Sequence, residues 1–194
     1  MNTNREYYHI VTREKFEVGQ KLVFKAETNN RLYDFFFKKE FINSDGKDAL
    51  QAINAGISSN GLQLGKEDTN LLLKYNDITI RGVRELVVEM VRLKNYANYP
   101  SRLNCLYVSE SYEDIVKWKK IFNSYKRNIV QIVKINANGN YFAGDGDLLP
   151  KEDAISFDKK INQAIKYWEN KSKPTLPEVL VDGNIEIVQI IEES

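Results

Sequence analysis

Three short segments of the chain carry side chains whose types suit chemistry on a bound nucleotide. Tyr107 ends an apolar run and precedes a small polar turn, so its ring is well placed to stack on a flat ring. Residues 7–12 contain His9, the only histidine of the chain. Residues 178–183 begin with the carboxylate Glu178. A stacking ring, an imidazole and a carboxylate together could hold a glycosidic bond and assist its cleavage.

Cleavage of the nicotinamide–ribose bond of NAD makes demands that these residue types can meet. The bond breaks with positive charge developing on the ribose, and a carboxylate such as Glu178 would stabilise that charge. The departing nicotinamide is flat and would stack on Tyr107. A hydrogen bond from His9 would fix the ribose hydroxyls and therefore the angle of attack. None of these roles requires a metal ion.

The order of the three segments resembles the His–Tyr–Glu branch of the ADP-ribosyltransferase superfamily, which includes diphtheria toxin and the poly(ADP-ribose) polymerases. Residues 8–12 (Tyr-His-Ile-Val-Thr) resemble its first motif, although Thr12 lies one residue later than in the commonest versions. Residues 106–111 (Leu-Tyr-Val-Ser-Glu-Ser) resemble its second motif, and residues 177–183 (Pro-Glu-Val-Leu-Val-Asp-Gly) its third. The Pro-Ser-Arg at 100–102 further resembles a bacterial family of uncharacterised proteins of this kind.

The resemblance implies roles for individual residues and a substrate. Glu178 would be the catalytic residue that binds a ribose 2′-hydroxyl and stabilises the oxocarbenium ion. His9, with Thr12 close behind it, would bind a ribose of NAD, and Tyr107 would stack on nicotinamide. Arg102 would contact the diphosphate or clamp the entry to its strand. NAD would be the substrate, and no metal would be needed.

The resemblance also implies partners. The acceptor would be a macromolecule, either protein or nucleic acid, and a bacterial toxin of this kind could have an antitoxin partner. Two alternatives stay open, namely a glycohydrolase that passes ADP-ribose to water and an inactive nucleotide-binding or interaction module. Each residue also has a plain structural interpretation: a lone strand histidine is usually structural, Tyr107 is one of 11 tyrosines, and Arg84 with Glu85 is expected to form a solvated pair.

Hydrophobic periodicity predicts an α+β fold in a single domain spanning residues 1–194. Alternating or β-branched runs predict strands over 6–12, 103–108, 129–135, 178–182 and 185–191. Helices are expected over 31–42, near 50–57, and over 79–95, 111–123 and 156–169. A loop is expected over 136–150, and Asp182-Gly183 is expected to join the last two strands as a two-residue hairpin. The resemblance adds that the antiparallel sheet would be split, strongly bent and flanked by helices.

Composition and the absence of common motifs narrow the possible partners, location and binding sites of the protein. With 28 basic and 27 acidic residues, the net charge of +1 gives no global reason to expect nucleic acid or an anionic membrane as a partner. No apolar run approaches the ~18 residues of a membrane span, and the N-terminus lacks a signal-peptide pattern, so a cytoplasmic location is expected. Walker A and Gly-x-Gly-x-x-Gly loops are missing from the sequence. One cysteine and one histidine disfavour a structural zinc site.

Overall fold

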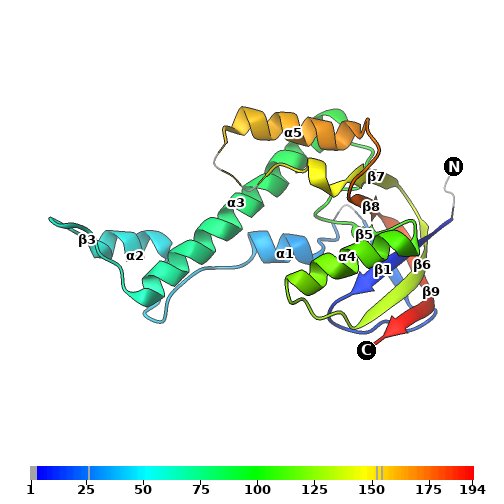
Figure 1. The fold of residues 1–194 in the computed structure, drawn as a ribbon, viewed down its shortest axis with the longest axis horizontal. Helices are drawn as coiled ribbons and strands as arrows, with labels where there is room; N and C mark the ends of the chain where they lie inside the picture. Colours follow the sequence, from blue (N-terminus) through cyan, green and yellow to red (C-terminus); the bar gives the residue numbers. More distant parts are fainter. Residues whose placement is uncertain (1–3, 26, 152, 154) are drawn as a thin grey trace.

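The computed structural model of the chain describes residues 4–25, 27–151, 153 and 155–194 (Figure 1). Its strands are β1 (Arg5–Val11), β2 (Lys21–Phe24), β3 (Ile57–Ser58), β4 (Gly61–Leu62), β5 (Leu106–Val108), β6 (Gln131–Asn138), β7 (Tyr141–Asp145), β8 (Pro177–Val181) and β9 (Gly183–Glu193). Its α-helices are α1 (Arg31–Phe37), α2 (Ala49–Gly56), α3 (Lys66–Asn95), α4 (Tyr112–Ser124) and α5 (Phe157–Glu169), with a 3-10 turn η1 (Gly146–Leu148).

Two antiparallel sheets form the body of the protein, as the α+β prediction requires. One sheet has the strand order β1-β6-β9-β2, and the other has the order β5-β8-β7. Main-chain hydrogen bonds connect the two sheets at Tyr8 and Ser109, which exchange both N–H···O bonds at 2.9 Å. Beyond that bridge the strands β1 and β5 separate. The chain thus builds two sheets that touch along one seam.

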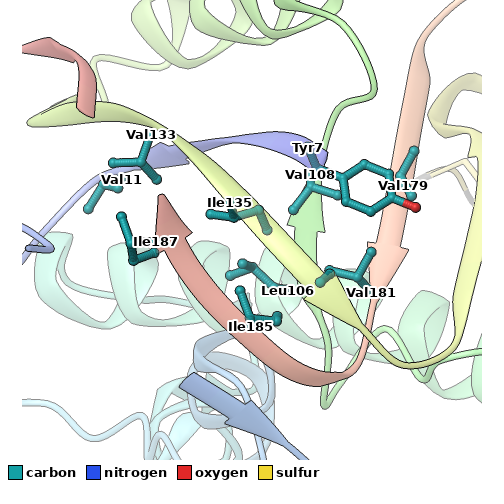
Figure 2. Close-up of a cluster of buried hydrophobic side chains, with 11 residues drawn as sticks. Tyr7, Val11, Leu106, Val108, Val133, Ile135, Val179, Val181, Ile185 and Ile187 are labelled. Atoms are coloured by element: carbon teal, nitrogen blue, oxygen red, sulfur yellow. The ribbon is translucent and has the colours of Figure 1, made fainter. Parts of the chain in front are cut away.

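The main hydrophobic core lies between the two sheets (Figure 2). Side chains alternate along a strand, so one face of each strand points to this core. On β8, Val179 and Val181 face it, while Glu178 and Leu180 point to the opposite side of the sheet. The core residues from the first sheet and from β5 are Tyr7, Val11, Val133, Ile135, Ala137, Ile185, Ile187, Leu106 and Val108. The register of β8 therefore decides which side Glu178 faces.

Helices cover the two outer faces. Helix α4 packs on β1 and β6 through Ile115, which contacts the buried Ile10 and Ile132. Helices α3 and α5 cross each other over the outer face of the second sheet (Figure 1), where Val88 and Trp168 pack around Leu180. Glu178 and Tyr107 lie on this helix-covered face. The order of layers is helix, sheet, sheet, helices.

The predicted hairpin at Asp182-Gly183 is wrong. Strand β8 pairs with β5 and β7, whereas β9 pairs with β6 and β2 in the other sheet. The two residues are therefore the corner at which the chain passes between sheets. Gly183 has φ +80°, and a Cβ there would meet the carbonyl oxygen of Asn138 at 2.4 Å. Sequence signals identified the turn, but the partner strands are set by the tertiary fold.

Other element boundaries also differ from those expected. The loop predicted over 136–150 contains the end of β6 and all of β7, because β7 pairs with β8 as an edge strand. Helix α3 begins at Lys66, well before residue 79, behind the N-cap Gly65 and with Glu67 and Asp68 in its first turn. Helical periodicity predicts one apolar stripe on this helix, but the stripe is only partly buried, since Leu86 and Met90 are exposed; its residues are Val83, Leu86, Val87, Met90 and Val91. Helix α1 ends at Phe37 and β5 begins at Leu106, so both are shorter than predicted.

A thin arm extends from the body to one side (Figure 1). It consists of α2, the β3–β4 pair and the first half of α3 and is called the arm below. Its buried apolar residues are Ala49, Ala52, Leu71 and Ile78, whereas Leu50, Ile57 and other large apolar side chains are exposed. None of the helices in the described part of the chain, α3 included, has the length and apolar character of a membrane span.

We expect the arm to open locally much more often than the sheets. Few buried apolar contacts offset the entropy of ordering it, so its opening free energies should be about 0–3 kcal/mol, against a global stability of about 5–15 kcal/mol. Amide hydrogen exchange over residues 49–70 measures this, with β6 and β9 as internal controls. Protection of the arm equal to that of β6 would contradict the expectation.

Candidate functional site

The three segments singled out in the sequence lie on neighbouring strands. Strand β5, with Tyr107, pairs with β8 so that Tyr107 lies opposite Leu180, two residues from Glu178. Strand β1, with His9, touches the other edge of β5 through the Tyr8–Ser109 bridge. The local order is therefore β1, β5, β8. Segments far apart in the sequence meet at the seam between the two sheets.

Arg102 and Glu178 form the centre of a buried ionic cluster. Nη1 of Arg102 donates a hydrogen bond to Oε1 of Glu178 and another, of 2.9 Å, to the hydroxyl of Tyr167. That hydroxyl donates in turn to the same Oε1 at 2.6 Å. Nε of Arg102 donates to Oε2 of Glu85 at 2.9 Å. These four residues, Glu85, Arg102, Tyr167 and Glu178, are called the ionic cluster below.

The ionic cluster is shut off from solvent. Relative exposure is 6% for Arg102, 5% for Glu178, 1% for Glu85 and 0% for Tyr167. Burial acts to lower the pKa of the Arg102 guanidinium, but the attraction of Glu178 and then Glu85 outweighs it, so that pKa is raised. For the Tyr167 hydroxyl, burial raises the pKa, and the neighbouring Glu178 raises it further. Arg102 is thus a permanent cation and Tyr167 a neutral donor.

The segment that carries Arg102 is held in place by Asn30. The side-chain amide of Asn30 donates to the carbonyl oxygens of Arg102 at 2.8 Å and Cys105 at 3.0 Å. Its Oδ1 caps α1 by accepting from the N–H groups of Leu32 and Tyr33. One asparagine therefore ties the start of α1 to the loop that leads into β5.

Glu85 is not the solvated residue that the sequence predicted. Its side chain is fully buried, because the second half of α3 lies under α5 and against the second sheet. Oε1 of Glu85 accepts from Nε of Arg84 at 3.0 Å, and Oε2 accepts from Arg102. Burial tends to raise the pKa of this carboxyl, but Arg102 and then Arg84 overcome that effect and lower it. Glu85 is therefore an anion within the protein interior.

Tyr107 lies beside Arg102. Its hydroxyl donates to the main-chain carbonyl of Arg102 at 2.7 Å, and the guanidinium carbon lies 5.2 Å from the centre of its ring. Burial raises the pKa of this hydroxyl well above its usual value. The structure therefore brings together three of the predicted residues, Arg102, Tyr107 and Glu178.

His9 joins this group through the main chain. Its Nδ1 lies 2.8 Å from the carbonyl oxygen of Tyr107, just past the point where β1 and β5 separate. A carbonyl oxygen only accepts, so Nδ1 carries the proton and Nε2 keeps a lone pair. The ring of Phe16 stacks on the imidazole at 6.2 Å between centroids. His9 thus presents an acceptor at the seam, but it makes no contact with the ionic cluster within the described residues.

His9 should make the stability of the protein depend on pH. Burial lowers its pKa from 6.5 to about 4, opposed by the bond to Tyr107. Between pH 6.5 and 4 the unfolded chain binds the proton and the folded protein does not, so stability falls as pH falls. Because the ring is half-buried, we expect about 1–2 kcal/mol of the loss to come from His9.

The variant His9→Asn isolates this contribution, since an amide donates to the same carbonyl without titrating. The difference in free energy of unfolding between the wild type and His9→Asn should shift by that amount from pH 7 to pH 4. A difference that stays constant over this range would show that His9 takes up its proton in the folded protein near its ordinary pKa.

Thr12 is not part of the group. It follows the last residue of β1, and none of the hydrogen bonds within the described residues joins it to Glu178, Tyr107 or Arg102. Its proposed contribution to binding therefore has no support in this arrangement.

The start of β8 is fixed by side chains from two other elements. Asp145 accepts hydrogen bonds from the N–H groups of Thr175 at 2.9 Å and Leu176 at 3.0 Å. Burial acts to raise the pKa of Asp145, but the bonds from Thr175 and Leu176 outweigh it, so that pKa is lowered. Nε1 of Trp118 donates to the carbonyl of Pro177 at 2.7 Å. These contacts determine where Glu178 enters the sheet.

Open space lies elsewhere on the described surface. A cavity of about 370 Å³ is lined by the polar face of α5, including Lys159 and Lys166, and a second of about 10 Å³ lies between Tyr7 and Tyr141. Neither is lined by His9, Tyr107 or Glu178. No group of three or more His, Cys, Asp or Glu side chains within the described part of the chain could hold a metal ion.

Sequence reasoning missed Tyr167 and Glu85. Tyr167 follows Ala164 by three residues on α5, so helical periodicity places it on the buried face. For Glu85, the signal was its position on α3 three residues before Val88, whose side chain is also buried. Neither signal shows that the polar ends would meet Arg102.

Comparison with known proteins gives one family match, which covers nearly the whole chain. Residues 7–193 match a family described as "Protein of unknown function (DUF2441)". No curated protein matches the chain. The match includes His9, Tyr107 and Glu178 and nearly all of both sheets. The chain therefore belongs to the DUF2441 family.

Proposed function

We propose that the protein is an NAD-dependent ADP-ribosyltransferase of the His–Tyr–Glu type. One observation carries the proposal: β1, β5 and β8, which bear His9, Tyr107 and Glu178, are consecutive neighbours at the seam of a split antiparallel sheet. The sequence resemblance implies that these three side chains form one site, although their segments are far apart in the chain. The ADP-ribosyltransferase-like form of the fold is part of the proposal.

Each side chain has a role in the proposed reaction. Glu178, which pairs with Arg102 in the closed site, would stabilise the positive charge that develops on the ribose as nicotinamide leaves. The lone pair on Nε2 of His9 would accept a hydrogen bond from a ribose hydroxyl. The ring of Tyr107 would stack on nicotinamide. The ADP-ribose would then pass to a nucleophile on a protein or nucleic acid.

Substrate binding must open the ionic cluster, because Glu178 is buried against Arg102. The diphosphate of NAD is a strong competitor for a guanidinium, since the two form charge-assisted hydrogen bonds. In the proposed cycle Arg102 turns from Glu178 to the diphosphate and leaves the carboxylate for the ribose. The arrangement described above is then the closed state of the site.

A second candidate function is an inactive module that binds a nucleotide or a protein partner. The observation that favours it is the burial of Glu178, whose side chain is 6% exposed and ion-paired. The two candidates differ in a simple respect. An enzyme depends on the charge of Glu178 for turnover, whereas a module binds its ligand without that charge.

The fate of ADP-ribose tests the proposal. NAD labelled in the adenine ring is incubated with the purified protein, with and without bacterial cell lysate. A transferase is expected to place the label on a macromolecule from the lysate. Label recovered as free ADP-ribose, unaffected by lysate, would indicate a glycohydrolase. Unchanged NAD that nevertheless binds would indicate the inactive module.

A further inference from the structure

We propose that Glu85 is a positioning residue for the site: by holding one edge of the Arg102 guanidinium, it fixes the edge that meets Glu178. The kinetic test of this inference rests on the proposed function, whereas its structural test is independent of that function. Glu85 lies on α3, outside the three motif segments.

The guanidinium of Arg102 is held on two sides. Nε meets Oε2 of Glu85 at 2.9 Å, and Nη1 meets both Oε1 of Glu178 and the hydroxyl of Tyr167. A guanidinium is planar and rigid, so fixing Nε also fixes the direction of Nη1. Glu85 on α3 therefore determines where Nη1 of Arg102, the donor to Glu178, lies.

Glu85 is itself anchored. Its other oxygen, Oε1, is held by Arg84, and its side chain has no exposed surface. Its main chain belongs to a 30-residue helix that packs against α5. A side chain held by packing and by a second layer of hydrogen bonds keeps its geometry better than one on a loop. Glu85 thus supplies a rigid reference for Arg102, which lies on a loop.

The charges of the group agree with this role. The two arginines Arg84 and Arg102 balance the charges of two carboxylates, Glu85 and Glu178. The ionic cluster together with Arg84 therefore carries no net charge.

Two substitutions separate positioning from simple charge. Glu85→Gln keeps the length and an acceptor oxygen but removes the charge, whereas Glu85→Asp keeps the charge but withdraws the acceptor by one methylene. Positioning predicts that kcat for nicotinamide release falls about tenfold in Glu85→Asp and less than threefold in Glu85→Gln, with KM unchanged within about twofold. The matched control is Glu192→Asp, which should leave kcat unchanged. It shortens a carboxylate on β9, in the other sheet, that is hydrogen-bonded to Tyr112 and Lys119 of α4.

The same variants have a readout that needs no activity. The Nε–H resonance of Arg102 in a ¹H–¹⁵N spectrum, assigned with Arg102→Lys, should be slow to exchange in the wild type and in Glu85→Gln. It should exchange at least tenfold faster in Glu85→Asp. This measurement still applies if the wild type releases no nicotinamide, which would overturn the proposed function alone.

Several results would overturn the positioning role. They are a larger loss of kcat in Glu85→Gln than in Glu85→Asp, an equal loss in Glu192→Asp, or an Arg102 resonance that is unchanged in Glu85→Asp. If Glu85→Asp does not fold, Glu85→Gln decides the question: a protected Nε–H supports the role, and its loss overturns it.

Discussion

The variant Arg102→Met is expected to unfold with about 3–5 kcal/mol less free energy than the wild type. Methionine fills a similar volume, but the change removes the cation that lies between two buried carboxylates, Glu85 and Glu178. Glu178 then lies buried with no cation against it, whereas Glu85 keeps its ion pair with Arg84 but loses the one with Arg102. Urea unfolding followed by circular dichroism at pH 7 measures the loss.

The controls for this prediction come from the same chain. Arg13→Met changes an exposed arginine and should alter the free energy of unfolding by less than about 0.5 kcal/mol. Adding Glu178→Gln to Arg102→Met removes the unpaired charge and should restore much of the stability, while Glu85 stays paired with Arg84. A loss below about 1 kcal/mol in Arg102→Met would mean that the ionic cluster is solvated in solution.

The variant Glu178→Gln is expected to lower the rate of nicotinamide release from NAD by about 10²–10³-fold. The amide keeps the size of the side chain and can still accept from Tyr167 and Arg102, but it lacks the negative charge that would stabilise the ribose cation. The protein should therefore remain folded. Chromatographic detection of nicotinamide over time, at saturating NAD, gives the rate.

Glu113→Gln is the matched control for this measurement, since Glu113 is an exposed carboxylate on α4. It should release nicotinamide at the wild-type rate. Equal rates in the wild type and in folded Glu178→Gln would remove Glu178 from the reaction and leave the residue with a structural role.

Much of the fold follows from local patterns in the sequence. Helix α4 begins after the N-cap Ser111, whose hydroxyl accepts from the N–H of Asp114, within one residue of the predicted boundary. The β-branched run before Asn136 forms β6 as expected. Such elements are specified by neighbours along the chain, through periodicity, caps and turn residues.

The remainder depends on contacts that local patterns do not encode. Asp182-Gly183 has the sequence of a hairpin turn, yet β8 and β9 join different sheets because the first sheet offers β6 as a partner for β9. Leu86 and Met90 fit a buried stripe, yet the covering elements lie on another side of α3. Residue types and spacing cannot reveal which face a distant element will cover.

In the candidate site, too, some features follow from the sequence and others depend on tertiary contacts. The order of His9, Tyr107 and Glu178 in the sequence predicted strands that do lie side by side. Burial of Glu178 and the participation of Glu85 came from the packing of α3 and α5, which brings their polar groups to Arg102. A carboxylate beside an apolar stripe is usually solvated, and only the tertiary fold shows the exception.

Release of nicotinamide from NAD by the purified wild-type protein is the most direct measurement of the central claim, made with and without cell lysate. The account predicts release well above the rate without enzyme, because His9, Tyr107 and Glu178 would form one site on neighbouring strands. A folded wild-type protein that releases no nicotinamide in either condition would contradict it.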